Sequence, residues 1–163
     1  MRKLMSVLIL SAMSISTYSY GAIGDIVIDG KINTKNHGDE YILKASDFNR
    51  MNTSSIKTTT SWTEAGHAVD FEGVKVKDIL NLVGASGKTL RMRALNDYWV
   101  DIPVSDVNTY DIILAHKMDG KVLQVRNFGP YFVIYPLDDY ATKLNSPVYL
   151  SRFIWQVNKI TVM

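Results

Sequence analysis

The sequence contains no cysteine, and this places the strongest limit on how the chain can hold a fold. Small exported domains commonly use disulfides when their hydrophobic core is too small to be stable alone. This chain must instead rely on apolar packing. With 163 residues, 47% of them hydrophobic, it is long enough for one domain with a sizeable core. The sequence shows no repeat, low-complexity tract or Pro/Gly-rich linker that would divide it.

Residues 1–21 have the pattern of a secretory signal peptide. Arg2 and Lys3 supply positive charge, the stretch Leu4–Ile15 is mostly apolar, and small residues at 19–21 have the spacing that a signal peptidase reads. The apolar stretch is too short, and too interrupted by serine, to span a bilayer core of roughly 30 Å. We therefore expect a removed signal, with a retained N-terminal anchor as the alternative.

Cleavage after Gly21 or Ala22 predicts a single mature domain over residues 22–163, located in the periplasm. Loss of the two basic residues in the signal lowers the Lys+Arg count from 18 to 16, which equals the 16 Asp+Glu. A near-neutral mature chain argues against a nucleic-acid binder, which would carry a basic face. We expect no nucleic-acid partner and no direct insertion into the membrane.

Most of the remaining sequence is typical of β-strands. Alternating or β-branched runs predict strands over 25–32, 40–45, 56–62, 68–76, 89–95, 98–102, 112–118, 121–125, 131–135 and 155–162. Asp119-Gly120 predicts a tight hairpin turn, and Asn96-Asp97 a short connection. Trp99 and Trp155 lie inside predicted strands, so we expect both rings in the core.

A few segments favour helix instead. Apolar residues of Val76–Val83 recur on one helical face, and Gly84 stands where a C-terminal cap belongs. Ser105 is a candidate cap for a short helical turn through Val107. The stretch Leu137–Phe153 fits a helix and an irregular wrap equally well. Together these patterns predict a β-rich α+β domain with a few short helices.

Five segments in a fixed order carry a resemblance to a known family. They are FEGVKVKDIL (71–80), RALNDYWVDIP (93–103), DIILAHKMDGKVL (111–123), GPYFVIYP (129–136) and FIWQVNKITV (153–162). This order resembles the molybdopterin-binding domain of the sulfite-oxidase type, over most of residues 56–162. The resemblance implies the fold of that domain and a cleft shaped for a pterin.

The sequence departs from that family at the metal ligand. Some members present a cysteine four residues before a tryptophan, and its thiolate ligates molybdenum. Alignment on Trp62 places Thr58 at this position. A threonine hydroxyl stays protonated near neutral pH and is a poor ligand for a soft metal site. We therefore expect no molybdenum and no catalytic residues.

The three histidines give no alternative set of metal ligands. His37, His67 and His116 lie on separate segments, without the local spacing that metal ligands show. We expect them at surface or turn positions, and we predict no metal-binding residues.

The motifs TTTSWT (58–63) and LNDY (95–98) narrow the resemblance. They are similar to a cysteine-free branch of the family, made of secreted proteins that bind a free pterin in the periplasm. Members of that branch regulate a membrane enzyme that makes or degrades cyclic di-GMP, and thereby biofilm formation. The resemblance implies a pterin ligand and, as partner, the periplasmic domain of an inner-membrane GGDEF/EAL-type signalling protein.

The chemistry of these motifs suits a pterin, which is flat and has a donor edge at its 2-amino and N3 positions. An aromatic face stacks on a flat heterocycle, and a carboxylate matches a pair of donors. Trp62 is the candidate stacking ring and Asp97 the candidate carboxylate, while Asn96 offers a donor and an acceptor and Tyr98 a second ring. The alternatives are a core tryptophan and ordinary Asn-Asp turn chemistry.

Four further residues complete the predicted ligand-binding set. Thr60 and Ser61 would line the pocket beside the tryptophan with hydroxyl groups. Tyr131, like Tyr135 and Tyr140, either lines a cleft or plugs it. Arg126, like Arg152, faces either the cleft or solvent, and surface arginine is the common case.

The sequence thus favours a non-catalytic pterin sensor, with the polar segment Leu137–Pro147 as a contact segment for its partner. The alternative is a molybdopterin-dependent or pterin-modifying oxidoreductase. A weaker third hypothesis is a structural module that keeps the fold without the pocket.

Overall fold

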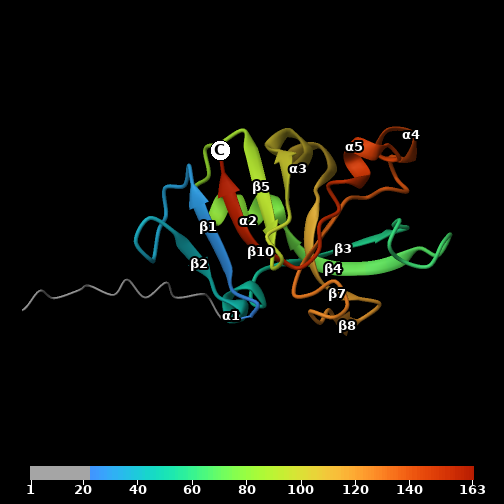
Figure 1. The fold of residues 1–163 in the computed structure, drawn as a ribbon, viewed down its shortest axis with the longest axis horizontal. Coiled ribbons are helices and arrows are strands. Elements are labelled where there is room, and N and C mark those ends of the chain that lie inside the picture. The colour runs from blue at the N-terminus through green and yellow to red at the C-terminus, as the bar shows by residue number, and fades with distance from the viewer. Residues whose placement is uncertain (1–22) are drawn as a thin grey trace, which may run out of the picture.

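The computed structural model describes residues 23–163, and these residues form two five-stranded sheets. The predicted signal peptide lies outside the described residues. The first sheet has the order β2-β1-β10-β5-β6. Its strands are β1 (Ile26–Gly30), β2 (Tyr41–Leu43), β5 (Thr89–Ala94), β6 (Trp99–Pro103) and β10 (Val157–Val162). β1 and β10 pair in parallel, so the two ends of the described chain share the centre of this sheet (Figure 1).

The second sheet has the order β3-β4-β7-β8, with β9 also paired to β7. Its strands are β3 (Thr53–Thr58), β4 (Val69–Lys75), β7 (Ile113–Met118), β8 (Lys121–Val122) and β9 (Phe132–Ile134). All of its pairings are antiparallel. Asp119 and Gly120, between β7 and β8, both have positive φ, 48° and 72°. These angles are typical of a type I′ turn and confirm the predicted hairpin.

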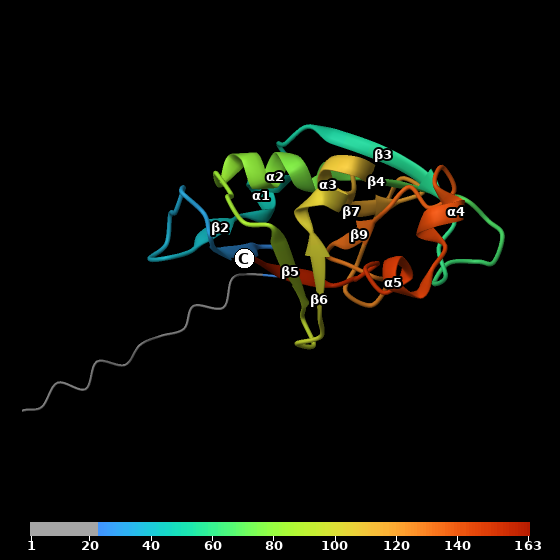
Figure 2. The same ribbon diagram turned by 90° about the horizontal axis from the view of Figure 1, so that it is seen from above.

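The described residues also contain five short helices, four of which gather at two places in the fold. They are α1 (Ala45–Phe48), α2 (Val76–Leu82), α3 (Val104–Tyr110), α4 (Ala141–Leu144) and α5 (Pro147–Leu150). α2 and α3 lie on one side of the first sheet, and α4 and α5 lie together at the far end of the molecule (Figure 2). Within residues 23–163, no helix is long and apolar enough to cross a membrane.

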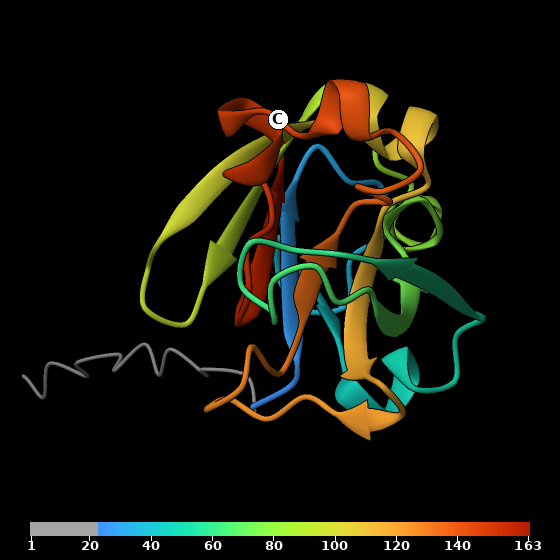
Figure 3. The same cartoon turned by 90° about the vertical axis from the view of Figure 1, so that its right-hand side faces the viewer.

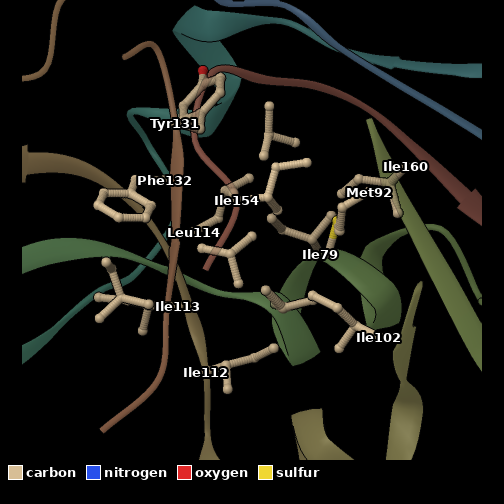
Figure 4. Packing of buried hydrophobic residues seen from close by; sticks show 14 of the residues in the cluster. Ile79, Met92, Ile102, Ile112, Ile113, Leu114, Tyr131, Phe132, Ile154 and Ile160 are labelled. Atoms are coloured by element: carbon tan, nitrogen blue, oxygen red, sulfur yellow. The ribbon is translucent and has the colours of Figure 1, made fainter. Parts of the chain in front are cut away.

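The core fills the space between the first sheet, the second sheet and α2. Figure 4 shows Ile79 of α2 packed among Met92 and Ile102 of the first sheet and Leu114 of β7, all of them fully buried. The predicted helical face is confirmed, because the apolar residues of Val76–Val83 recur toward this core. Apolar packing therefore joins the two sheets, as a chain without cysteine requires.

Trp99 corrects one expectation, because its ring is not in the core but 46% exposed. In β6 the alternate residues Val100 and Ile102 turn inward, which leaves Trp99 and Asp101 on the outer face of the sheet. There the Arg91 guanidinium lies 3.8 Å from the centre of the Trp99 ring. The same group bonds both oxygens of Asp101 at 2.9 Å.

Two smaller expectations also need correction. Ser105 does not cap a helix, because α3 begins at Val104 directly after Pro103 and has no side-chain cap. His116 is not a surface or turn residue, because it is half-buried in β7 with its ring 5.5 Å from that of Phe48. Burial lowers the pKa of His116. The stretch 137–153, for which the sequence fits a helix and an irregular wrap equally well, contains both: two short helices, joined and flanked by irregular chain.

Gly73 provides a test of how closely β4 and β7 approach. A Cβ atom at this position would lie 2.1 Å from the carbonyl oxygen of Leu114, and backbone cannot move aside as a side chain can. We expect Gly73→Ala to lower the free energy of unfolding by about 3 kcal/mol. Gly66→Ala is the control, because a Cβ atom at Gly66 would meet open space. It should lower the free energy of unfolding by about 1 kcal/mol, from the positive φ alone. Urea unfolding measures both, and equal losses would contradict this packing.

Candidate functional site

The run of threonines that ends in Trp62 forms a loop and not the end of a strand. β3 ends at Thr58, and the β3–β4 loop (59–68) extends at the end of the molecule that carries α4 and α5 (Figure 1). The Thr60 hydroxyl oxygen accepts hydrogen bonds from the backbone N–H groups of Trp62 (3.2 Å) and Thr63 (3.1 Å). A hydroxyl that bonds nearby backbone in this way competes with strand pairing and favours a turn.

The base of this loop is bonded to Asp138, which follows the buried residue Leu137. The Thr59 N–H donates to one carboxylate oxygen at 2.8 Å, and the Thr59 hydroxyl donates to the other at 2.6 Å. In return, the Asp138 N–H donates to the Thr58 hydroxyl oxygen at 3.1 Å. Thr58 is fully buried. Thr58, the residue that the resemblance places at the position of a cysteine, is therefore engaged in holding two segments together.

An aromatic cleft of about 280 Å³ lies between the β3–β4 loop, the tip of the β5–β6 hairpin and the segment that leads into β10. This volume is close to the lower end of the roughly 300–1,000 Å³ typical of small-molecule sites. The lining residues carry no formal charge and are mostly apolar or aromatic. They are Trp62, Ala94, Asn96, Tyr98, Ser151, Phe153, Ile154, Trp155 and Gln156.

Three rings form one side of the aromatic cleft. The ring centre of Trp62 lies 5.8 Å from that of Phe153 and 5.5 Å from that of Trp155. Phe153 is buried, whereas Trp62 and Trp155 are half-buried. Both expectations for Trp62 therefore hold in part, because it packs against the edge of the core and also lines the cleft. Trp155 was expected in the core and lies at its edge.

The β5–β6 hairpin projects from the body of the molecule (Figure 3), and residues near its tip line the cleft as well. At its tip the Asn96 side-chain oxygen accepts a hydrogen bond from the Tyr98 N–H at 3.1 Å, and Asp97 has a φ of 66°. This is the turn chemistry named as the alternative, yet Asn96 and Tyr98 also line the cleft. The Asp97 carboxylate is not among the lining groups and lies 3.7 Å from the Arg93 guanidinium.

Ser151 and Gln156 add polar groups that the sequence did not single out. Ser151 donates its hydroxyl hydrogen to the Val148 carbonyl at 2.8 Å. Gln156 donates from its amide nitrogen to the Val125 carbonyl at 2.7 Å, which leaves its amide oxygen as an acceptor beside the cleft. Gln156 has a φ of 59°, and no periodicity in the sequence indicates such a position.

Thr60 and Ser61 lie on the other side of the loop, in a second hollow of about 250 Å³. Its lining is more polar than that of the aromatic cleft. The lining residues are Thr59, Thr60, Ser61, Gly66, Leu137, Asp138, Ala141 and Asn145. The structure therefore brings Trp62, Asn96 and Tyr98 together, but it does not bring Thr60 and Ser61 into the same cleft.

The remaining predicted residues lie away from the aromatic cleft. Arg126 is exposed and does not line it. Tyr131 is buried, with its hydroxyl donating to the Gly24 carbonyl at 2.6 Å. Its ring centre is 4.5 Å from that of Phe48, so it fills the core. Arg152 pairs with the buried Asp106 at 2.5 Å and does not line the cleft either.

A thiolate-ligated metal does not fit the residues present. The chain has no cysteine, and the Thr58 hydroxyl is buried and bonded to Asp138. In the described part of the chain, no group of three or more His, Asp or Glu side chains is arranged to hold a metal ion. The aromatic cleft fits a flat organic ring better, because its ring surfaces and amide groups suit stacking and in-plane hydrogen bonds.

Comparison with known proteins agrees with this architecture. The model of the oxidoreductase molybdopterin-binding domain family matches residues 41–138. The sulfane dehydrogenase SoxCD from Paracoccus pantotrophus has a similar fold, with a TM-score of 0.61 and 16% sequence identity over 93% of this chain. This chain spans 40% of the length of that SoxCD chain. A search of curated proteins found no match.

Tyr131 gives a prediction that depends on pH. Burial, with a smaller contribution from Asp25, raises the pKa of Tyr131 to about 12. In the unfolded chain the pKa of tyrosine is about 10. The stabilisation that comes from the raised pKa is therefore complete below about pH 10 and is lost as the pH rises toward 12. Tyr131→Phe should cost about 1 kcal/mol at neutral pH, through loss of the bond to Gly24.

Above about pH 10, the free energy of unfolding should fall more steeply for the wild type than for Tyr131→Phe. Urea unfolding at a series of alkaline pH values measures the two slopes. Because Tyr131 does not line the aromatic cleft, the substitution should leave ligand affinity unchanged. Identical slopes would show that Tyr131 is not buried as described.

Proposed function

The chain belongs to the oxidoreductase molybdopterin-binding domain family, and we propose that it is a non-catalytic member that binds a free pterin in the periplasm. We further propose that it relays its ligand state to the periplasmic domain of an inner-membrane enzyme that makes or degrades cyclic di-GMP. The fold supports a pterin-type ligand. The location, partner and lack of catalysis are inferred from the sequence and from the site.

The observation that carries this proposal is the state of Thr58. In metal-dependent members with a cysteine at this position, a thiolate faces the metal. Here a threonine takes that place, is fully buried, and accepts a hydrogen bond from the Asp138 backbone. A buried hydroxyl with this partner supports a role in holding the fold and not in ligating a metal.

The aromatic cleft supports a pterin as the ligand. Its rings offer faces for stacking, among them those of Trp62 and Tyr98. The free amide oxygen of Gln156 and the amide of Asn96 are suited to the hydrogen-bonding edge of a pterin. Asp97, the carboxylate favoured from the sequence, stands outside the lining, so we assign the edge contacts to the two amides instead.

The alternative function is a molybdopterin-dependent or pterin-modifying oxidoreductase, a class of enzyme that the family description includes. A metal-dependent enzyme would need a ligand set without a thiolate, because the chain contains no cysteine. A pterin-modifying enzyme would need a group able to transfer a proton or hydride at the ring. Of the side chains that commonly transfer protons, the lining of the aromatic cleft contains only Tyr98 and no His, Asp, Glu or Lys, which favours binding over chemistry.

Trp62→Ala should weaken the binding of an unconjugated pterin such as neopterin by roughly tenfold or more, because stacking and burial of the ring are lost. Trp99→Ala is the matched control, since Trp99 is a half-exposed tryptophan on the outer face of the first sheet. Calorimetric titration gives the affinities, and melting curves confirm that each variant is folded. Equal losses in both variants, or no binding by the wild type, would contradict the proposal.

Binding to the partner should depend on the pterin. A ligand shifts an equilibrium only by its differential affinity for two states, and the coupling is reciprocal. The periplasmic domain of a cyclic di-GMP enzyme should therefore change the pterin affinity by the same factor by which the pterin changes partner affinity. Titrations of each component with and without the other measure both factors. Partner binding that is identical with and without neopterin would exclude the relay.

A further inference from the structure

Residues of the β3–β4 loop line two separate hollows, the aromatic cleft and the second hollow. Trp62 stands on the cleft side, and Thr60 and Ser61 stand on the side that faces Ala141 and Asn145. The second hollow is partly formed by the segment Leu137–Pro147, which the sequence favours as the contact segment for a partner. One short loop thus lies between the candidate ligand site and the candidate partner surface.

Few attachments hold this loop. Within residues 23–163, the hydrogen bonds of residues 59–68 are internal to the loop, go to Asp138, or join the Thr59 carbonyl to the hydroxyl of its neighbour Thr58. The Trp62 ring adds contacts to a distant segment, with Phe153 and Trp155. The position of Trp62 is therefore set by a polar anchor three residues before it and by the rings that it touches.

The anchor at Asp138 is well suited to transmit a displacement. Both of its carboxylate oxygens accept hydrogen bonds from Thr59, and its own N–H donates to the Thr58 hydroxyl. The side chain and the backbone of Asp138 are therefore both bonded to the end of β3 and the start of the loop. Hydrogen bonds to a charged carboxylate are shorter and stronger than neutral ones. Leu137 is buried next to it, and α4 begins three residues after it, at Ala141.

We propose that Asp138 is a positioning residue that couples the segment Leu137–Pro147 to Trp62. The proposal deepens the proposed function, on which its ligand and partner parts rest. A ring stacked on Trp62 fixes the loop, the loop fixes Thr59, and Thr59 fixes Asp138 together with the start of the contact segment. A partner that displaces the contact segment acts on Trp62 through the same bonds, as reciprocity requires.

Asp138 and Asp139 therefore have different roles, although the sequence gives them the same appearance. The Asp138 carboxylate is engaged with Thr59. Asp139 is exposed, and in the described part of the chain its side chain makes no hydrogen bond or ion pair. Asp139→Asn is thus a matched control for Asp138→Asn, with the same change in charge one residue away.

The first measurement needs no ligand. We expect Asp138→Asn to raise hydrogen exchange of the loop amides, Thr59 above all, by on the order of tenfold, because the amide loses the negative charge that strengthens both bonds and has one acceptor oxygen in place of two. Acrylamide quenching of Trp62 should rise as well, measured in a Trp99→Phe/Trp155→Phe background. Thr59→Val, which removes one bond and keeps the other, should have an intermediate effect, and Asp138→Glu should restore part of the protection.

Asp139→Asn should leave exchange and quenching at the wild-type values. Wild-type values in both Asp138→Asn and Thr59→Val would overturn the proposal, as would an equal change in Asp139→Asn. Thr59→Val keeps the test decisive if Asp138→Asn does not fold, because it alters the same anchor from the other side. Melting curves separate a loosened loop from a general loss of stability.

The second measurement adds neopterin to the full chain. Saturation should slow amide exchange of residues 139–145 in the wild type, and this effect should disappear in Asp138→Asn. Affinity should fall by about fivefold in Asp138→Asn, since the loop must first be ordered. Neopterin that binds without slowing exchange at 139–145 would overturn the coupling. No binding by the wild type would contradict the proposed function, while the ligand-free measurement still tests the anchor.

Discussion

Apolar packing between the two sheets is the interaction on which every part of the site depends. The three walls of the aromatic cleft come from different elements: the β3–β4 loop of the second sheet, the β5–β6 hairpin of the first, and the segment before β10. No disulfide joins them, because the chain has no cysteine. Buried residues such as Ile79, Met92 and Leu114 fix the sheets relative to one another, and the strand ends then bring the walls together.

Thr58, which the resemblance places where some related enzymes carry a cysteine, determines what the end of β3 can do. A cysteine there would serve as a soft metal ligand, whereas the threonine hydroxyl accepts a hydrogen bond from the backbone of Asp138. The bond joins the end of β3 to the segment that follows β9, 80 residues later in the chain. In our account, the position at which the resemblance places a metal-ligating cysteine instead holds the β3–β4 loop in place.

The fold followed from local patterns because strand alternation, the period of Val76–Val83 and the Asp119-Gly120 turn are short-range signals. The site was predicted only in part, because its residues meet through tertiary contacts. The threonine run resembled a strand, but the Thr60 hydroxyl closes a turn that sends Trp62 and Ser61 to opposite sides of the loop. Trp99 was misjudged because alternation fixes two faces without saying which one is buried.

Native mass spectrometry of the protein isolated from the periplasm, combined with elemental analysis of the same sample, tests the central claim most directly. We expect a mature chain that carries one molecule with the mass of an unconjugated pterin and no stoichiometric molybdenum. Stoichiometric molybdenum, or a bound molecule with the mass of a molybdenum–molybdopterin cofactor, would contradict the account and favour the oxidoreductase.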